Sequence, residues 1–297
     1  MLKKISWGIL LFIILTYPGH GPDQTFHLLR QPPKVQAVPT VTPLRFPVID
    51  SASPPISSAK AIYIFEPLTG TVLYEKNAHE RLPMASTTKI MTALVALDIY
   101  APETLLTVYT ADDAVGHTMK LLPQDHISVR DLLYGLLVSS GNDAALALAE
   151  NYPGGDYRQF ISQMNKKATV LGLTDTRFSN VSGLDDGNHY SSVRDLALLA
   201  KKLLENDLLR QIVSTKDITV TSADGHRYSL TNTNQLLGSL PGVLGLKTGW
   251  TPVAGQCLVT YTDRDGNQLI TAILGSSDRF SDSENLINWA YSHTFWQ

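Results

Sequence analysis

Three short motifs supply the side chains from which a catalytic site could be built. They occur along the chain in the order Ser86-Thr87-Thr88-Lys89, Ser140-Gly141-Asn142 and Lys247-Thr248-Gly249. Together they offer a hydroxyl nucleophile, two candidate proton carriers, and a lysine and hydroxyl that can bind a carboxylate. These residue types predict acyl transfer by a serine enzyme that uses no catalytic histidine or aspartate.

The first motif precedes a predicted helix, Ile90–Leu97, which is apolar almost all round and must be buried. Lys89 follows Ser86 by three residues, so both side chains lie on one helical face. A serine hydroxyl needs a base within hydrogen-bond reach, and a lysine serves as one only when it is neutral. Burial and a nearby cation both lower a lysine pKa, and Lys247 is the candidate cation. The helix start also offers the N–H of Ser86 as half of an oxyanion hole.

The S-x-x-K spacing alone is not specific, because Ser57-Ser58-Ala59-Lys60 has it as well. That copy lies in a proline-rich stretch and runs into a predicted strand, so no helix brings its serine and lysine together. We therefore assign the chemistry to Ser86 and Lys89.

The other two motifs each have an ordinary structural interpretation. Ser140–Asn142 lies between two predicted helices, where these residue types form caps and turns, although such a loop can also point side chains into a cleft. Lys247–Gly249 fits a strand end followed by a turn. As an edge strand it would bind an extended substrate, with Lys247 and Thr248 on a carboxylate and Gly249 permitting close approach. The order of the three motifs, each on a suitable element, favours the catalytic interpretation.

The hydrophobic patterns predict an α/β fold, in which an antiparallel sheet is flanked by helices and a helical lobe is inserted in the middle of the chain. Two hairpins supply strands to this sheet. The hairpin strands are predicted at Ala61–Phe65 with Thr71–Tyr74, and at Gln256–Thr262 with Gln268–Gly275. The helices are predicted at Ile90–Leu97, Arg130–Val138, Asp143–Glu150, Arg158–Leu171, Val193–Leu204 and Ser283–Thr294.

The composition excludes several classes of protein. A length of 297 residues with 43% hydrophobic residues suffices for a real core in one large domain or two modest ones. The net charge of -3 gives no basic footprint, so we expect no nucleic-acid partner. Cys257 is the single cysteine, which excludes an intrachain disulfide and a cysteine-based zinc site. The eight histidines form no H-x-x-x-H or H-x-H pair, and we expect no metal and no cofactor.

The N-terminal residues have the pattern of an export signal. Lys3 and Lys4 precede an apolar run of 13 residues, Ile5–Tyr17, which is shorter than the roughly 20 residues of a spanning helix. No clear cleavage site follows, so residues 1–21 are interpreted as either a cleaved signal peptide or an uncleaved N-terminal anchor. Residues 22–59 carry many prolines and are predicted to be a tether. Residues 60–297 are predicted to be the catalytic domain, exported to the periplasm or cell wall.

The motifs and their surroundings resemble the D-alanyl-D-alanine carboxypeptidases, which are low-molecular-mass penicillin-binding proteins of the S11 serine peptidase family. The resemblance covers about residues 61–294 and extends well beyond three short motifs. The matching stretches are Pro83–Ala93, Ser140–Ala144, Ser182–Leu184, Asn188–Ser192, Arg194–Asp195 and Gly245–Gly249.

This resemblance implies removal of the terminal D-Ala from peptidoglycan stem pentapeptides through an acyl-enzyme on Ser86, with β-lactams as inhibitors. Lys89 would accept the proton of Ser86, and Ser140 would relay a proton to the leaving group. The implied substrate-binding residues are Asn142 for the substrate amide, Lys247, Thr248 and Arg279 for the terminal carboxylate, Gly249 in the binding strand, and the N–H of Trp250 for the oxyanion. His189 and Tyr190 match a family signature that we interpret as structural.

The chain departs from the family pattern at two points. Family members often carry histidine at the position of Trp250, so the rim of this site differs. Many relatives also continue into a β-sandwich domain and a C-terminal amphipathic anchor. Here roughly 20 residues follow the predicted strand that ends at Gly275, which is enough for one helix. Membrane attachment would therefore depend on the N-terminal segment.

Three alternatives share part of the pattern. A class A β-lactamase has the first and third motifs, but it normally has S-D-N in the middle and a deacylating glutamate in an E-x-x-L-N pattern, and this sequence has neither. A D-alanyl-endopeptidase of the same family keeps identical motifs. An inactive cell-wall-binding module would usually have lost Ser86 or Lys89, and both are present. The carboxypeptidase is the predicted function, with the endopeptidase left open.

Overall fold

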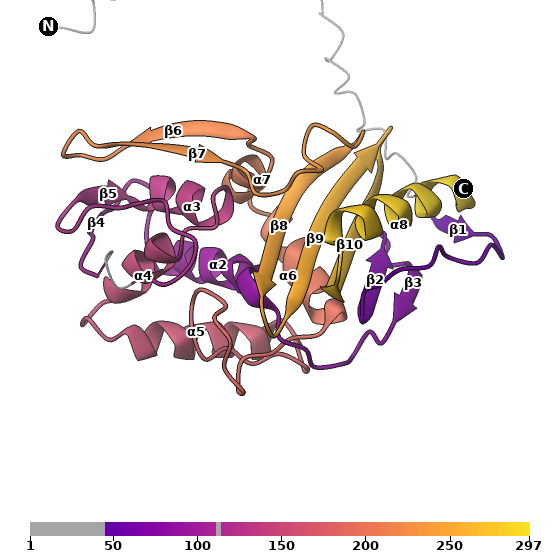
Figure 1. Ribbon diagram of the computed structural model, residues 1–297, viewed down its shortest axis with the longest axis horizontal. Helices are drawn as coiled ribbons and strands as arrows, with labels where there is room; N and C mark the ends of the chain where they lie inside the picture. Colours follow the sequence, from indigo (N-terminus) through magenta and orange to yellow (C-terminus); the bar gives the residue numbers. More distant parts are fainter. Residues whose placement is uncertain (1–44, 111–113) are drawn as a thin grey trace, which may run out of the picture. The chain divides into compact units, whose positions relative to one another are not determined.

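The computed structural model describes residues 45–110 and 114–297. The signal or anchor expected at residues 1–21, and the part of the tether at 22–44, lie outside the described residues. Within the described ranges, an antiparallel sheet is flanked by helices and a helical lobe lies beside it (Figure 1). The predicted fold class is confirmed. No helix of this part of the chain has the length and apolar character needed to cross a membrane.

The central sheet has five strands in the order β3-β2-β10-β9-β8. Both predicted hairpins are present, as the antiparallel pairs β2–β3 and β9–β10. Strand β8 contains Lys247–Gly249 and forms one edge of the sheet, as the sequence predicted. The strands are β2 (Ala61–Phe65), β3 (Val72–Lys76), β8 (Val243–Thr251), β9 (Gly255–Arg264) and β10 (Asn267–Ser276).

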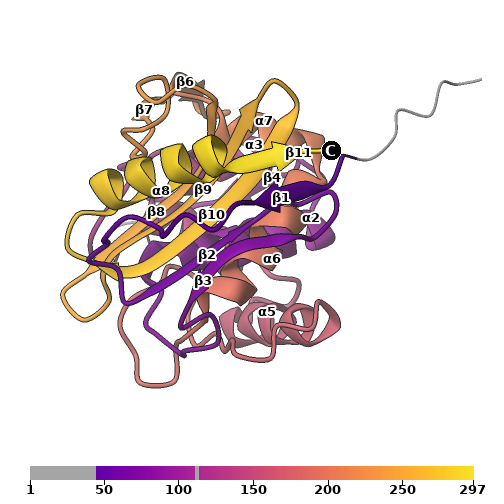
Figure 2. The same cartoon turned by 90° about the vertical axis from the view of Figure 1, so that its right-hand side faces the viewer.

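Both faces of the sheet are covered, which explains why β2 is buried along its whole length. Successive strand residues point to opposite faces. The first, third and fifth residues of β2 belong to the core shared with the helical lobe, and the second and fourth belong to the core under α8 (Arg279–His293). Figure 2 shows α8 crossing in front of β8, β9 and β10. The sheet is therefore a rigid platform held between two apolar layers.

The lobe is built around α2 (Lys89–Ile99), the apolar helix that the sequence predicted to be buried. Its first eight residues, Lys89–Ala96, are all buried. A short 3₁₀ turn, η1 (Ala85–Thr88), leads into it. The other helices are α3 (Val129–Leu137), α4 (Asn142–Glu150), α5 (Tyr157–Val170), α6 (Val193–Leu204) and α7 (Asp207–Val213). Two small hairpin sheets complete the lobe, β4 (Leu105–Thr107) with β5 (His126–Ser128), and β6 (Asp217–Thr221) with β7 (Arg227–Thr231).

Helix α8 begins at Arg279, four residues before the predicted start at Ser283. The carboxylate of Asp278 accepts a hydrogen bond from the N–H of Ser281 and caps the helix, a feature that the apolar pattern did not reveal. Thr294, predicted to end this helix, instead begins strand β11 (Thr294–Trp296). The earlier start makes Arg279 the first residue of the helix rather than part of the preceding loop.

Residues 45–59 contact the catalytic domain, although the sequence analysis assigned them to the tether. Strand β1 (Pro47–Ile49) pairs antiparallel with β11. The hydroxyl of Ser58 donates to the carboxylate of Asp282 at 2.6 Å. These partners lie near the other end of the chain, with 224 residues between Ser58 and Asp282, so no local pattern indicated them. The folded part therefore begins before Lys60.

Candidate active site

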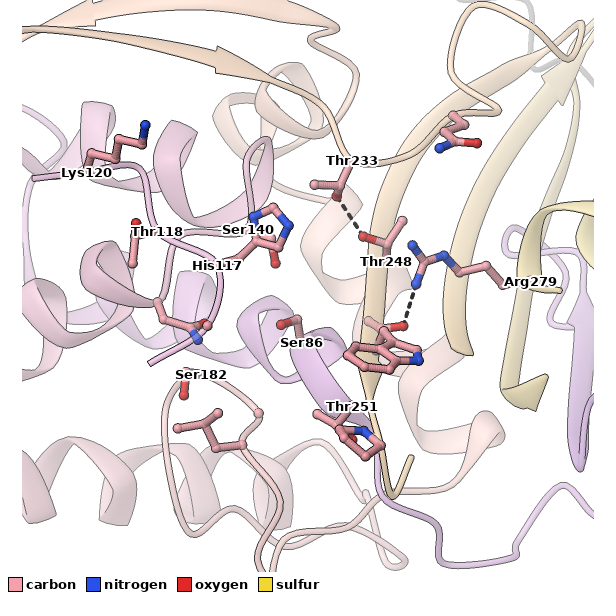
Figure 3. A pocket seen from close by; sticks show the side chains of 18 residues that line it. Ser86, His117, Thr118, Lys120, Ser140, Ser182, Thr233, Thr248, Thr251 and Arg279 are labelled. Carbon is pink, nitrogen blue, oxygen red and sulfur yellow. Dashed lines mark hydrogen bonds between the residues drawn. The ribbon is translucent and has the colours of Figure 1, made fainter. Parts of the chain in front are cut away.

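The predicted site residues come together in a cleft between the helical lobe and the edge strand β8 (Figure 3). The cleft has a volume of about 890 Å³. Lys89 and Lys247 are buried in its walls. The other predicted residues line it directly: Ser86, Ser140, Asn142, Thr248, Gly249, Trp250 and Arg279. The competing pair Ser57 and Lys60 lies in chain without helical structure and does not line the cleft.

Ser86 lies in the η1 turn, whose backbone is held in an unusual conformation. Ala85 has a φ of 48°, in the left-handed region that residues other than glycine rarely adopt. Two hydroxyls of the turn bind its carbonyls: Thr87 Oγ1 donates to Met84 O at 2.6 Å, and Thr88 Oγ1 donates to Ala85 O at 2.8 Å. No side chain caps the turn, so the N–H groups at its start are available to an oxyanion.

His189 supports this turn from outside. Its Nδ1 accepts a hydrogen bond from the N–H of Ser179 at 3.0 Å, which leaves the ring proton on Nε2. Nε2 then donates to Thr88 Oγ1 at 2.7 Å. Burial lowers the pKa of His189 to about 4, so the ring is neutral at physiological pH. His189 therefore has the contacts of a structural residue, as the sequence analysis interpreted it.

Two glycines allow other segments to reach the backbone of the Ser86 turn. A β-carbon at Gly183 would lie 1.9 Å from Ala85 O, and the φ of Gly183 is 94°. A β-carbon at Gly249 would lie 3.0 Å from the backbone N of Ser86. Gly249 thus permits β8 to pack against η1, whereas the sequence analysis explained it by the approach of substrate. This packing places the N–H of Ser86 beside the strand that continues to Trp250.

The amine of Lys89 is fully buried and has three hydrogen-bond partners. Nζ lies 2.9 Å from Ser86 Oγ, 2.6 Å from Asn142 Oδ1 and 2.8 Å from Ser182 O. Burial lowers the pKa of Lys89 well below its ordinary value of 10.5, and the charge of Lys247 lowers it further. The sequence predicted both causes.

These partners determine what a neutral amine does at this position. The amide oxygen of Asn142 and the carbonyl oxygen of Ser182 can only accept hydrogen bonds, so the two N–H groups of a neutral Lys89 donate to them. The nitrogen lone pair then faces the hydroxyl of Ser86, which can donate its proton. The arrangement therefore suits a base that takes the proton of Ser86.

Asn142 is the first residue of α4, and the segment at 115–121 fixes it. Its Nδ2 donates to Val115 O, and its N–H donates to His117 O at 2.7 Å. The buried carboxylate of Asp143 accepts two further N–H groups of this segment, both at 3.0 Å. The same carboxylate partly opposes the lowering of the Lys89 pKa. Both ends of the Asn142 amide are thus bonded within the protein, and the amide orients Lys89.

Ser140 follows α3 and has a left-handed backbone with a φ of 63°. The next residue, Gly141, leaves room for the carboxylate of Asp143, because a β-carbon there would lie 2.7 Å from Asp143 Oδ1. Ser140 is largely buried but lines the cleft, on the lobe side opposite β8 (Figure 3). Its hydroxyl is therefore accessible to a bound substrate.

The β8 side of the cleft has groups that can bind an anion. Thr248 Oγ1 and Thr233 Oγ1 are 2.6 Å apart, and Arg279 Nη1 donates to Gly249 O at 2.8 Å, with its guanidinium beside Thr248 (Figure 3). The Nε of Arg279 is buried and has no hydrogen-bond partner among the described residues. Lys247 Nζ bonds to Thr248 O at 3.1 Å and does not line the cleft. Burial, with the nearby Arg279 charge, lowers the pKa of Lys247 to about 7.

The charges of the cleft favour an anionic substrate. Lys120 and Arg279 line it, and no Asp or Glu of the described residues does. In the described part of the chain, no cluster of His, Cys, Asp or Glu side chains has an arrangement that could hold a metal ion.

Sequence reasoning identified the side chains that carry reactive groups but not several that position them. Gly183 and Asp143 lie in stretches that were matched to the family without a role, and Thr233 belongs to no motif. Thr251 Oγ1 donates to Asp185 Oδ1 at 2.7 Å, a bond between the end of β8 and the loop after Gly183. Such contacts join segments far apart in the chain and have no local signal.

The close packing at Gly183 leads to a test of the Ser86 turn. We expect Gly183→Ala to displace Ala85 and to lower the rate at which Ser86 is acylated by about 10²-fold, because a misplacement of about 1 Å has that effect on catalysis. Penicillin acylation followed by mass spectrometry measures it. Gly187→Ala is the matched control, since a β-carbon there meets no atom within 4 Å. Equal acylation rates in the two variants would contradict the expectation.

Comparisons with known proteins agree with this site. The model of the D-alanyl-D-alanine carboxypeptidase family matches residues 49–278. D-alanyl-D-alanine carboxypeptidase DacF of Bacillus subtilis is 37% identical over 243 residues, which cover 79% of this chain and 62% of that protein. A D-alanyl-D-alanine endopeptidase of Pseudomonas aeruginosa is 35% identical over 257 residues, covering 80% of this chain and 82% of that one.

Among solved structures, the crystal structure of the Streptomyces K15 DD-transpeptidase superposes with a TM-score of 0.77 at 36% identity. The match covers 81% of this chain and 100% of that one. The chain spans less than two thirds of the length of the Bacillus subtilis relative. Because the family model matches more than half of the sequence, the chain belongs to the D-alanyl-D-alanine carboxypeptidase family.

Proposed function

We propose that this protein is a serine D-Ala-D-Ala carboxypeptidase, which removes the terminal D-Ala from peptidoglycan stem pentapeptides through an acyl-enzyme on Ser86. One observation carries the proposal. The amine of Lys89 is buried, has a lowered pKa, and lies 2.9 Å from Ser86 Oγ with its other two hydrogen bonds directed to fixed acceptors. A serine with such a partner is an activated nucleophile.

In the acylation step, Ser86 Oγ attacks the carbonyl carbon of the penultimate D-Ala while its proton passes to Lys89 Nζ. The N–H groups of Ser86 and Trp250 would receive the oxyanion. The intermediate collapses when the amine of the terminal D-Ala leaves with a proton relayed through Ser140. Water then attacks the ester, gives up a proton to the same base, and releases the shortened peptide and Ser86.

The terminal carboxylate of the substrate would bind at the β8 side of the cleft. Thr248 offers a hydroxyl there, and Arg279 offers a guanidinium whose buried Nε has no hydrogen-bond partner among the described residues. Lys247 would add charge from behind the wall of the cleft. Positioning by this remote contact brings the scissile carbonyl to Ser86, so the binding energy also lowers the acylation barrier.

β-Lactams would acylate Ser86 by the same step and inhibit the enzyme. A strained lactam amide takes the place of the D-Ala-D-Ala amide. The described residues lining the cleft include no carboxylate that could act as a separate base for deacylation. The acyl-enzyme with a β-lactam should therefore persist, which favours a penicillin-binding protein over a β-lactamase.

A second function is favoured by the comparison with the Pseudomonas aeruginosa endopeptidase. A D-alanyl-endopeptidase would form the same acyl-enzyme, but it must accept a chain that continues past the bond that is cut. The two functions therefore differ in whether a free carboxylate is required.

The substrate class implies that the enzyme acts on the cell wall. We propose that residues 1–21 export it to the periplasm or cell wall, as a cleaved signal peptide or as an uncleaved anchor in the cytoplasmic membrane. The partners in this proposal are the peptidoglycan stem peptide and β-lactam inhibitors. Nucleic acid is not among them.

The assignment of Ser86 is tested by trapping the acyl-enzyme. Penicillin should add one adduct to the wild-type protein and none to Ser86→Ala, because the variant has no hydroxyl to acylate. Intact-mass measurement detects the adduct. Ser57→Ala, which alters the competing S-x-x-K pair, should be labelled like the wild type. An adduct that persists in Ser86→Ala would remove the basis of the mechanism.

The role of Lys89 is tested with arginine, which keeps the charge but stays protonated. We expect Lys89→Arg to lower acylation by about 10²–10⁴-fold, the usual contribution of a general base. In the wild type, only the neutral amine acts, so the acylation rate should rise with pH and level off well below pH 10.5 because the pKa of Lys89 is lowered. Stopped-flow acylation across pH measures both effects, with Lys166→Arg on exposed α5 as control. A rate within a few-fold of wild type in Lys89→Arg would refute the assignment.

The requirement for a free carboxylate separates the two candidate functions. Amidating the terminal D-Ala of a pentapeptide should lower kcat/KM by about 10²-fold or more, since loss of a charged hydrogen-bonded contact is worth roughly 3 kcal/mol. Arg279→Ala should lower activity on the free acid far more than on the amide. Chromatographic assay of released D-Ala or D-Ala amide measures both rates. If the amide or a cross-linked dimer is cleaved as fast as the free pentapeptide, the endopeptidase is the better assignment.

A further inference from the structure

A second hollow of about 410 Å³ adjoins the active-site cleft on the lobe side. The two cavities share Thr118 and Lys120 in their walls. We propose that this hollow is a subsite for a carboxylate carried by the acyl-donor part of the substrate. The inference rests on the proposed function and extends it, because it names a second anionic group that the substrate should have.

The hollow lies between the segment at 118–122 and strand β7 of the small β6–β7 hairpin. Ser139 lines it, while the next residue, Ser140, lines the active-site cleft. The left-handed turn at Ser140 thus separates two connected cavities. A substrate bound at Ser140 has the entrance of the second hollow beside it.

The wall of the hollow is cationic. Lys120 and Arg227 are exposed at its rim and form no ion pair among the described residues, and His226 lines it as well. No Asp or Glu of the described residues belongs to the lining. The nearest acidic contact is Asp125, whose buried carboxylate bonds to Tyr228 and His226. Its charge is thus taken up behind the wall, and the two rim cations remain for an anion.

The segment that carries Lys120 is held in one conformation. Lys120 has a φ of 64°, which is rare for a residue with a side chain. The N–H groups on either side of it, those of Met119 and Leu121, both donate to the carboxylate of Asp143 at 3.0 Å. The N–H of Leu122 donates to Tyr228 OH at 3.3 Å. Strained backbone that its surroundings enforce is typical of binding sites, and here it fixes the cation at the junction of the two cavities.

The position of the hollow indicates which part of the substrate would reach it. In Figure 3, Arg279 and Lys120 lie on opposite sides of Ser86. If Arg279 binds the carboxylate after the scissile bond, Lys120 lies on the side of the acyl donor. The favoured substrate is therefore a D-Ala-D-Ala peptide whose preceding residue ends in a free carboxylate.

Two matched peptides test this inference. Both are Nα-acetyl-L-Lys-D-Ala-D-Ala, with the lysine side chain carrying either a succinyl group, which ends in a carboxylate, or a succinamoyl group, which ends in an amide. Calorimetry on the full-length Ser86→Ala protein should show about threefold to tenfold tighter binding of the succinyl peptide, in the range of partly exposed charge pairs. Arg227→Gln, in the Ser86→Ala background, should reduce this preference while leaving binding of the succinamoyl peptide unchanged. Arg158→Gln on α5 is the matched control, because this exposed arginine lies outside both cavities.

Equal affinities of the two peptides would overturn the subsite, as would a preference that Arg227→Gln and Lys120→Gln both leave unchanged. Turnover by the wild-type protein is measured in parallel. Cleavage of neither peptide would count against the proposed carboxypeptidase function, whereas the binding preference still decides the subsite.

Discussion

The burial of one lysine amine among three hydrogen-bond acceptors is the constraint on which the rest of the site depends. An amine removed from water is stable in its charged form only with compensation, and the neutral form is the one that can take a proton from Ser86. The two fixed acceptors come from different segments, Asn142 at the start of α4 and Ser182 in the loop before α6. Lys89 is therefore positioned correctly only when helical lobe, loop and turn are all in place.

The backbone around Ser86 shows a similar dependence on distant segments. The left-handed Ala85 is surrounded by Gly183 on one side and Gly249 on the other, and the neutral ring of His189 secures the turn through Thr88. Each of these contacts excludes a side chain or a charge rather than adding one. The nucleophile is thus held by close packing, with its hydroxyl turned to the cleft and its N–H beside β8.

The parts of this structure that sequence predicted are those whose geometry is local. Ser86 and Lys89 lie within one helical turn, and the hairpins follow from short alternating patterns, so both were predictable. The partnership of Thr233 with Thr248 and the pairing of β1 with β11 depend on how distant segments dock, which no spacing rule encodes. Lys247 was found by its motif, yet its burial behind the wall became evident only from the structure.

The pairing of β1 with β11 also has a mechanical meaning. The described chain enters the domain beside its own C-terminal strand, and a second clamp follows where Ser58 binds Asp282 (Figure 2). A pull applied to the chain ahead of Phe46 would first load these two sets of hydrogen bonds. They would yield before strain reached β2 and, through the sheet, the strand that carries Lys247. The attachment thus works as a strain relief, so that the enzyme can be held at one end without distorting its catalytic cleft.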